Sequence, residues 1–83
     1  MDEQKNLHLF LKKELNDGRI KYIRVITAGN QINYVEVTME GNKPSDYKES
    51  NPDQNFVDGL LAEPEVVGIS PILFSGKTGI PLV

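Results

Sequence analysis

The stretch Ser75-Gly76-Lys77-Thr78 contains the residue types that end a phosphate-binding loop. In such loops the backbone N–H groups, the lysine and the hydroxyl contact phosphates and Mg²⁺. The first glycine of the motif would fall at position 71, which is Pro71, and the four residues after Gly79 leave no room for the required helix. We therefore interpret the stretch as a hairpin turn flanked by glycines, capable at most of a weak anion contact.

The remaining polar residues do not predict catalysis, and we expect a non-catalytic protein with no cofactor and no metal. His8 is the one histidine in a chain without cysteine, so no second imidazole or thiolate can share a metal with it. A serine nucleophile would need an elbow motif that the sequence lacks. The acids of 53–65 have no spacing that directs two carboxylates into a shared pocket.

The charge is uneven along the chain. The net charge is −3, but residues 1–24 carry six Lys or Arg against four acids, whereas residues 25–83 carry three lysines against eight acids. Domains that bind nucleic acid through bulk charge are usually net basic, so such binding is disfavoured. An alternative remains, in which a strip of Lys13, Arg19, Lys21 and Arg24, with the Gly76-Lys77 turn, contacts a nucleic acid or a nucleotide.

Length and composition predict one domain spanning residues 1–83. A chain of 83 residues has room for one hydrophobic core. Small secreted domains usually depend on disulfides or metals, so the lack of cysteine favours a cytoplasmic location. No apolar stretch is long enough to span a bilayer, and we expect no membrane association.

The first segment has the spacing of an amphipathic helix that ends at Gly18. Its apolar residues recur at i, i+3, i+4 and i+8: Leu7, Phe10, Leu11 and Leu15. Residues 19–40 then predict two β-strands, because β-branched and aromatic residues flank Gly29-Asn30, a pair typical of a type II′ turn. With those two residues as the loop, Ile20 faces Met39 and Thr27 faces Ile32.

The second half of the chain predicts a loop, a helix and one or two strands. Residues 42–50 lose periodicity and predict a flexible surface loop. Asn51-Pro52-Asp53-Gln54 predicts the start of a helix with Asn51 as its cap, which Pro64 ends. The run 66–74 predicts a buried strand, and 80–83 an optional edge strand.

These elements predict an α+β fold in the order α-β-β-α-β(-β). The simplest arrangement is a two-layer sandwich in which both helices pack on one face of a mainly antiparallel sheet of three or four strands. In the alternative, the helices lie on opposite faces of the sheet. The two-layer form leaves one face of the hairpin bare, and that face forms the predicted interaction surface: Ile23, Val25, Thr27, Ile32, Tyr34 and Glu36.

The leading functional hypothesis is a small regulatory or accessory protein that binds a protein partner, or a second copy of itself as a homodimer, through an exposed sheet face or edge. Two alternatives stay open. One is the nucleic-acid or nucleotide contact described above, and the other is a small-ligand binder or enzyme subunit whose site forms only in an oligomer.

Overall fold

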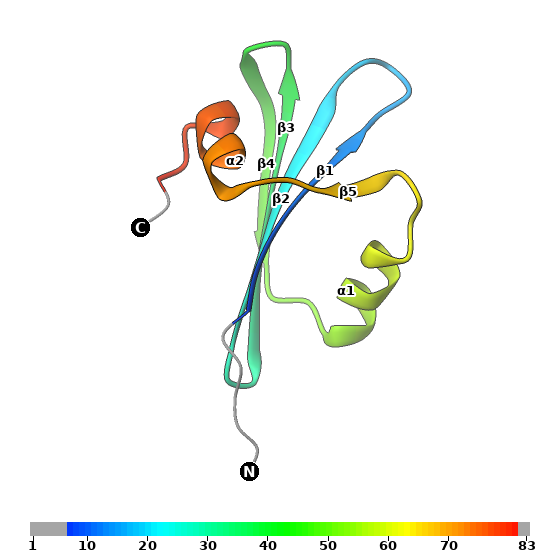
Figure 1. The fold of residues 1–83 in the computed structure, drawn as a ribbon, viewed down its shortest axis with the longest axis vertical. Coiled ribbons are helices and arrows are strands. Elements are labelled where there is room, and N and C mark those ends of the chain that lie inside the picture. The colour runs from blue at the N-terminus through cyan, green and yellow to red at the C-terminus, as the bar shows by residue number, and fades with distance from the viewer. Residues whose placement is uncertain (1–6, 82–83) are drawn as a thin grey trace.

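Five antiparallel strands form one sheet with two short helices packed against it (Figure 1). The computed structural model describes residues 7–81. The elements in chain order are β1 (Leu7–Glu14), β2 (Ile20–Ala28), β3 (Gln31–Glu40), β4 (Lys43–Ser50), α1 (Gln54–Leu61), β5 (Val66–Gly68) and α2 (Pro71–Thr78). The strand order in the sheet is β4-β3-β2-β1-β5. The α+β class is therefore confirmed, but the order of elements differs from the predicted one.

The predicted N-terminal helix is wrong, because residues 7–14 form strand β1. β1 pairs with β2 in a hairpin in which Leu11 lies opposite Ile23, and Gly18 (φ 92°) closes the turn. Both faces of this sheet are covered, so β1 carries apolar side chains at odd and even positions. Leu7 and Leu11 with Phe10 then happen to match the i, i+3, i+4 spacing of a helix.

The predicted β2–β3 hairpin is confirmed together with its register. Ile20 pairs with Met39, Thr27 pairs with Ile32, and every pair between them follows the predicted alignment. Gly29 has a φ of 63°, which a type II′ turn requires at its first central residue. This hairpin occupies the middle of the sheet, so its two faces carry most of the core.

The predicted flexible loop at 42–50 is also wrong, because Lys43–Ser50 forms edge strand β4. All eight of its residues are exposed, so the strand leaves no apolar pattern in the sequence. Backbone pairing with β3 holds it in place, and the Ser45 hydroxyl donates to the Thr38 carbonyl over 3.2 Å. The register shifts between Thr38 and Met39, which marks a β-bulge.

The predicted central helix is present as α1 and begins later than expected. Asp53, and not Asn51, is the N-cap, since its carboxylate accepts from the Phe56 N–H over 3.0 Å. Asn51 instead donates through its side chain to the Ile32 carbonyl over 2.8 Å, which ties the start of this segment to β3. The helix ends at Leu61, before Pro64.

The predicted strand at 66–74 and the turn after it are wrong beyond Gly68. β5 is only three residues long, and Pro71–Thr78 forms helix α2. Ser70 caps this helix by accepting from the Leu73 N–H over 3.0 Å, and Gly79 (φ 79°) ends it. The optional strand at 80–83 does not form in its described part: Ile80 packs on the core, whereas Leu82 and Val83 lie outside the described residues.

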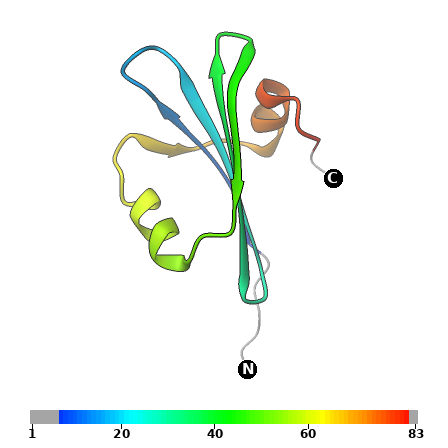
Figure 2. The ribbon, with the colours of Figure 1, turned by 180° about the vertical axis from the view of Figure 1, so that it is seen from behind.

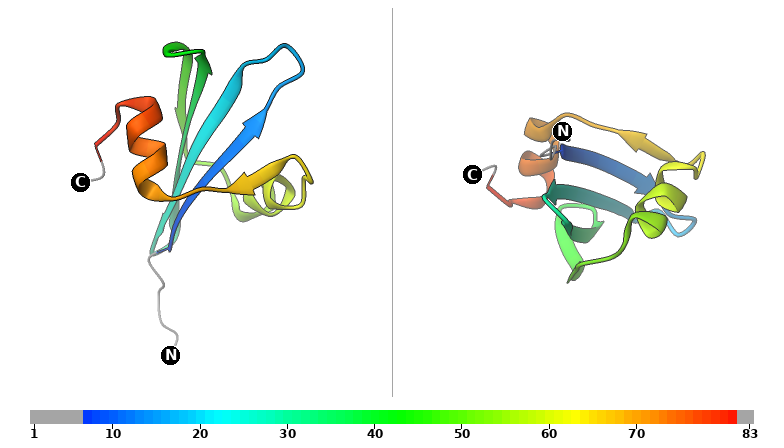
Figure 3. Two further views of the ribbon diagram at one scale, coloured as in Figure 1. Left: turned by 45° about the horizontal axis from the view of Figure 1, so that its top comes forward. Right: turned by 90° about the horizontal axis from the view of Figure 1, so that it is seen from below.

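The two helices lie on opposite faces of the sheet, so the predicted one-sided sandwich is wrong and its alternative is observed (Figures 2 and 3). We call the two sides the α1 face and the α2 face. The α1 face buries Leu11, Ile23, Val25, Ile32 and Tyr34 beneath Val57 and Leu60. The α2 face buries Tyr22, Val35, Val37 and Met39 beneath Phe74.

Candidate functional site

The interaction surface predicted from the hairpin is buried inside the protein. Ile23 and Val25 are each 1% exposed, and they belong to the cluster that Val57 and Leu60 of α1 complete. Ile32, Tyr34 and Glu36 are also buried, and Thr27 is half-buried. The six residues do share one side of the sheet, but Val57 and Leu60 of α1 pack on its apolar members, so they form no exposed docking surface.

Tyr34 and Glu36 form a buried polar pair on this face. The Tyr34 hydroxyl donates to Glu36 Oε1 over 2.6 Å, and Lys21 Nζ lies 3.1 Å from Glu36 Oε2. Burial, and then the neighbouring carboxylate, raise the pKa of the Tyr34 hydroxyl far above its ordinary value. Burial opposes ionisation of Glu36 most strongly, but the hydrogen bonds from Tyr34 and Lys21 together lower its pKa. These groups satisfy one another and link β2 to β3 within the hairpin.

Of the predicted Lys/Arg strip, the structure brings only Lys13 and Lys21 together, as opposite residues of the β1–β2 pair, and Lys21 lies beside Glu36. Lys13 Nζ lies 2.6 Å from Glu63 Oε1, and Arg19 Nε lies 2.8 Å from Asp17 Oδ2. Arg24 lies on the α2 face, where its Nη2 donates to Asn33 Oδ1 over 3.4 Å. The Gly76-Lys77 pair lies inside α2 and forms no hairpin turn. The structure therefore brings no phosphate-binding arrangement together from these residues.

The N-terminal part of β1, residues 7–9, presents an open strand edge. The Leu15 N–H donates to the Arg19 carbonyl over 2.8 Å, so the backbone groups of odd-numbered β1 residues point to β2. Even-numbered residues therefore point to the other side, where the Phe10 carbonyl accepts from the Ile69 N–H over 2.9 Å. His8 is the next residue of this set, and its backbone has no partner in the strands and turns of residues 7–81.

The edge is open because β5 covers only part of it. β5 pairs with Leu11, Lys12 and Lys13, and the next residue, Ile69, still bonds to Phe10. After Ile69 the chain leaves the edge and crosses to the α2 face. Residues 7–9 of β1 consequently lack a neighbouring strand on this side among the described residues.

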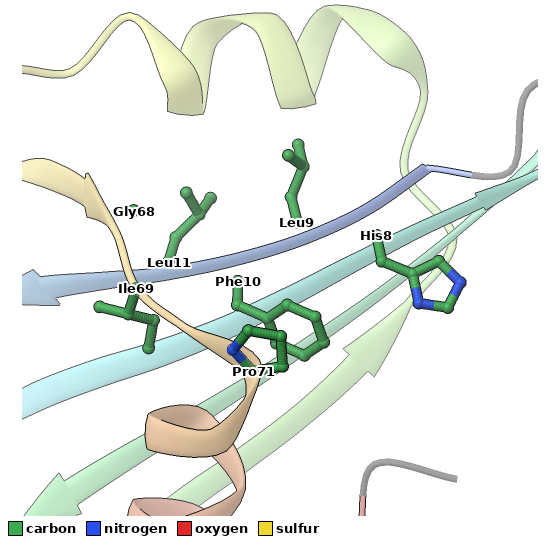
Figure 4. A pocket seen from close by; sticks show the side chains of 7 residues that line it. All are labelled: His8, Leu9, Phe10, Leu11, Gly68, Ile69 and Pro71. Carbon is green, nitrogen blue, oxygen red and sulfur yellow. The ribbon is translucent and has the colours of Figure 1, made fainter.

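An apolar groove of about 450 Å³ lies along this open edge (Figure 4). It is lined by His8, Leu9, Phe10, Leu11, Gly68, Ile69 and Pro71. Leu9 and Leu11 point toward α1, whereas His8 and Phe10 point to the opposite side, where α2 begins. Phe10 is held there by Phe74, whose ring centroid is 5.2 Å from its own. The groove thus combines unpaired backbone groups with apolar side chains on both sides.

None of these groove residues was predicted as a functional site. The sequence did contain a usable signal, since Leu7, Leu9 and Leu11 recur at every second position as on one face of a strand, but Phe10 between them completes a competing helical spacing. An open edge also depends on where β5 leaves β1, which is a property of the tertiary structure.

Other site types find no support in the described part of the chain. Within residues 7–81, no group of three or more His, Cys, Asp or Glu side chains is arranged to hold a metal ion. Neither of the two described helices has the length or apolar character needed to cross a bilayer. No protein-family model, curated protein or solved structure matches the chain.

Proposed function

We propose that this chain is a non-catalytic protein-interaction domain that binds an extended segment of a partner protein at the open edge of β1. The observation that carries the proposal is the outward-facing backbone of His8 inside an apolar groove. A strand that adds to a sheet edge gains affinity from backbone hydrogen bonds and specificity from pockets for alternate side chains. The β1 edge offers both features in one place.

The chemistry of the groove defines the kind of segment it fits. Consecutive side chains of an added strand point to opposite faces of the sheet. One would contact Leu9 and Leu11 on the α1 side, and the next would contact Phe10 and Pro71 on the α2 side. The expected ligand is therefore a short run of consecutive apolar residues in extended conformation. Ile69 already occupies the place opposite Phe10, so the pairing is limited to the first residues of β1.

A regulatory or accessory role in the cytoplasm is the biological setting that we propose for this binding. The chain contains no cysteine, which fits a reducing compartment. The groove is short, so it contacts few side chains of the bound segment and should bind it weakly and reversibly. Regulatory contacts require such reversible binding to a segment that is exposed in its own protein.

The test is selection of peptides from a random display library on the immobilised protein, followed by titration of the best binder. Apolar peptides should be enriched, and they should shift the NMR amide signals of His8, Phe10 and Ile69. His8→Pro removes the outward N–H without removing a hydrogen bond to β2, so it should weaken binding at least about tenfold.

Two control variants make the result specific. His8→Ala keeps the backbone groups and should bind within about twofold of the unchanged protein, because the proposal assigns affinity to the backbone of this residue. Tyr47→Pro places the same type of change on the opposite sheet edge, β4, and should leave binding intact. Equal binding by His8→Pro, with an unchanged circular-dichroism spectrum, would contradict the proposal, as would shifts confined to another surface.

A further inference from the structure

The outer edge of β4 is a second place where backbone groups face away from the sheet. Ala28 and Gln31 flank the two-residue turn and are hydrogen-bonded to each other through their backbones. The backbone N–H and C=O groups of odd-numbered β3 residues therefore point to β2, and those of even-numbered residues point to β4. Lys48 pairs with Glu36 and therefore points its backbone inward. The backbone groups of its neighbours Tyr47 and Glu49 point outward, and all of β4 is exposed.

Both ends of this edge are closed to pairing. Pro44 has no N–H to donate, and the β-bulge beside it interrupts the regular strand between Thr38 and Met39 of the neighbouring β3. At the other end, Pro52 lies two residues beyond Ser50, the last residue of β4, where the chain turns into the α1 segment. The usable edge is thus the short stretch 45–49, which restricts both the length and the register of any added strand.

We propose that a second copy of this chain pairs with β4 antiparallel, about a two-fold axis at Tyr47, and joins the two sheets edge to edge. Charge complementarity selects the occupant and the register. Outward backbone groups alternate, so the two copies can be aligned only in steps of two residues. The alignment centred on Tyr47 places each Asp46 opposite Lys48 of the second copy, on the α1 face.

The neighbouring alignments are disfavoured by like charges. Centring the axis on Asp46 places this carboxylate opposite its own copy, and centring it on Lys48 places the two ammonium groups opposite each other. Like charges directly opposite each other in a sheet are destabilising, whereas opposite charges are favourable. A strand whose acidic and basic residues flank a central tyrosine is therefore complementary to itself in only one of these three registers.

Contacts within one copy prepare the charged row for this pairing. Lys21 Nζ lies 3.1 Å from Glu36 Oε2, and Lys48 is the neighbour of Glu36 in β4. Asp46 of the second copy would continue this alternation of charge across the seam. On the α2 face Tyr47 is 57% exposed, and the axis would bring two such rings together as a cross-strand aromatic pair.

The two-fold arrangement also limits the assembly to a dimer. Each copy uses the same strand, so both β4 edges are consumed and no further copy can add there. Figure 3 shows that α1 and α2 flank the sheet on its two faces and leave the β4 edge uncovered. The paired stretch is short, so the dimer is expected to dissociate on dilution and to weaken as salt screens the charge pairs.

Charge reversal tests the register directly. Asp46→Lys and Lys48→Asp should each raise the dissociation constant of the homodimer about tenfold, because both attractive pairs become repulsive. An equimolar mixture of the two variants should associate again, since each Lys then faces an Asp in the mixed dimer. The doubly exchanged variant, Asp46→Lys with Lys48→Asp, should self-associate like the unchanged chain. Sedimentation equilibrium over a dilution series measures all four.

Lys43→Asp is the matched control. It makes the same charge change on the same strand but lies beyond Pro44, so the dimer constant should stay within about twofold. Circular dichroism confirms that each variant is folded.

Three results would overturn the inference. One is a protein that stays monomeric up to about 1 mM, a range that includes weak edge contacts. Another is single variants that associate as the unchanged chain does, and the third is a mixture that associates no better than its components. Amide exchange gives an independent check, because concentration should protect the amides of Tyr47 and Glu49 while leaving those of Lys48 and Ser50 unchanged. The β1 groove plays no part in this dimer, so failure of either proposal leaves the other standing.

Discussion

Replacing Phe74 with alanine should remove the main anchor of α2. Phe74 is 1% exposed and completes the cluster of Tyr22, Val35, Val37 and Met39 on the α2 face. Truncating a buried phenylalanine costs about 3–5 kcal/mol, through lost burial together with the cavity that remains. A domain of 83 residues has a total stability of about 4–12 kcal/mol, so the loss is a large fraction of it.

The loss should be concentrated in α2, because an eight-residue helix is not stable without tertiary packing. The caps at Ser70 and Gly79 remain in the variant but contribute only about 1 kcal/mol each. We therefore expect faster amide exchange across α2 before the sheet unfolds, and a lower urea midpoint for the whole domain. Detachment of α2 would also release Phe10, whose ring packs on Phe74 beside the β1 groove.

Urea denaturation followed by circular dichroism measures this loss, with Ile72→Ala as the control in the same helix. Ile72 is 76% exposed, so its truncation should cost less than about 0.5 kcal/mol. Phe74→Leu keeps the site apolar and should cost about 1–2 kcal/mol, which keeps the test usable if the alanine variant does not fold. A cost below about 1.5 kcal/mol for Phe74→Ala, or equal costs for the two alanine variants, would refute the assignment of Phe74 as the anchor.

Three further predictions concern the sheet. Gly29→Val should cost about 1–3 kcal/mol in chemical denaturation, because Gly29 has a φ of 63°, and an unchanged midpoint would contradict the assigned turn. Arg24→Met should leave the free energy of unfolding unchanged or raise it by about 1 kcal/mol, since Arg24 Nε is buried with no partner among the described residues. A decrease of about 1 kcal/mol in the same assay would show that the guanidinium is needed. Glu36 has a lowered pKa when folded, so its contribution is present above its unfolded pKa and lost as pH falls through the folded value. Between about pH 6 and about pH 3 the urea midpoint should therefore fall less for Glu36→Gln than for the unchanged protein, and parallel pH profiles would argue against this role.

The sequence predicts the β2–β3 hairpin well because local and tertiary signals agree there. Gly29 supplies the positive φ that the turn needs, and β-branched residues on both sides favour strands. The start of α1 is predicted to within a few residues for a similar reason, since Asp53 and Pro52 both occur in the segment that begins the helix. In each case the residues that fix the conformation lie close together in the chain.

The rest of the fold depends on contacts that the chain makes only after folding. β1 has apolar side chains at both odd and even positions because a helix covers each face of the sheet. The alternation of apolar and polar residues that is typical of a strand is therefore not visible in its sequence. β4 is specified by its backbone pairing with β3 and not by burial. For α2 two signals compete: Ser70, Pro71 and Gly79 are a typical cap, first-turn residue and stop of a helix, whereas the apolar run 66–74 that overlaps them favours a buried strand.

The same coverage explains why the predicted interaction surface failed and why strand edges take its place. An apolar stripe such as Ile23 with Val25 predicts that something must cover it, and α1 does so within the chain. Once both faces are covered, the backbone of the outer strands offers the remaining pairing capacity of the sheet. The sequence could not locate these sites, because the pattern of side chains does not show which strand becomes an edge.

The two edges differ in chemistry, and this difference separates the two proposals. At β4 the edge residues are charged or polar around Tyr47, so recognition there depends on placing opposite charges across the seam and should weaken with salt. At β1 the groove is lined by Leu9, Phe10 and Ile69, so binding there should depend little on salt. A salt titration of both activities in one preparation therefore distinguishes them: dimerisation should weaken as ionic strength rises while peptide binding persists. β1 and β4 are separated by two strands in the sheet, so the two binding sites are independent. A parallel decline of both activities with salt would therefore contradict the assignment of peptide binding to the apolar groove at β1.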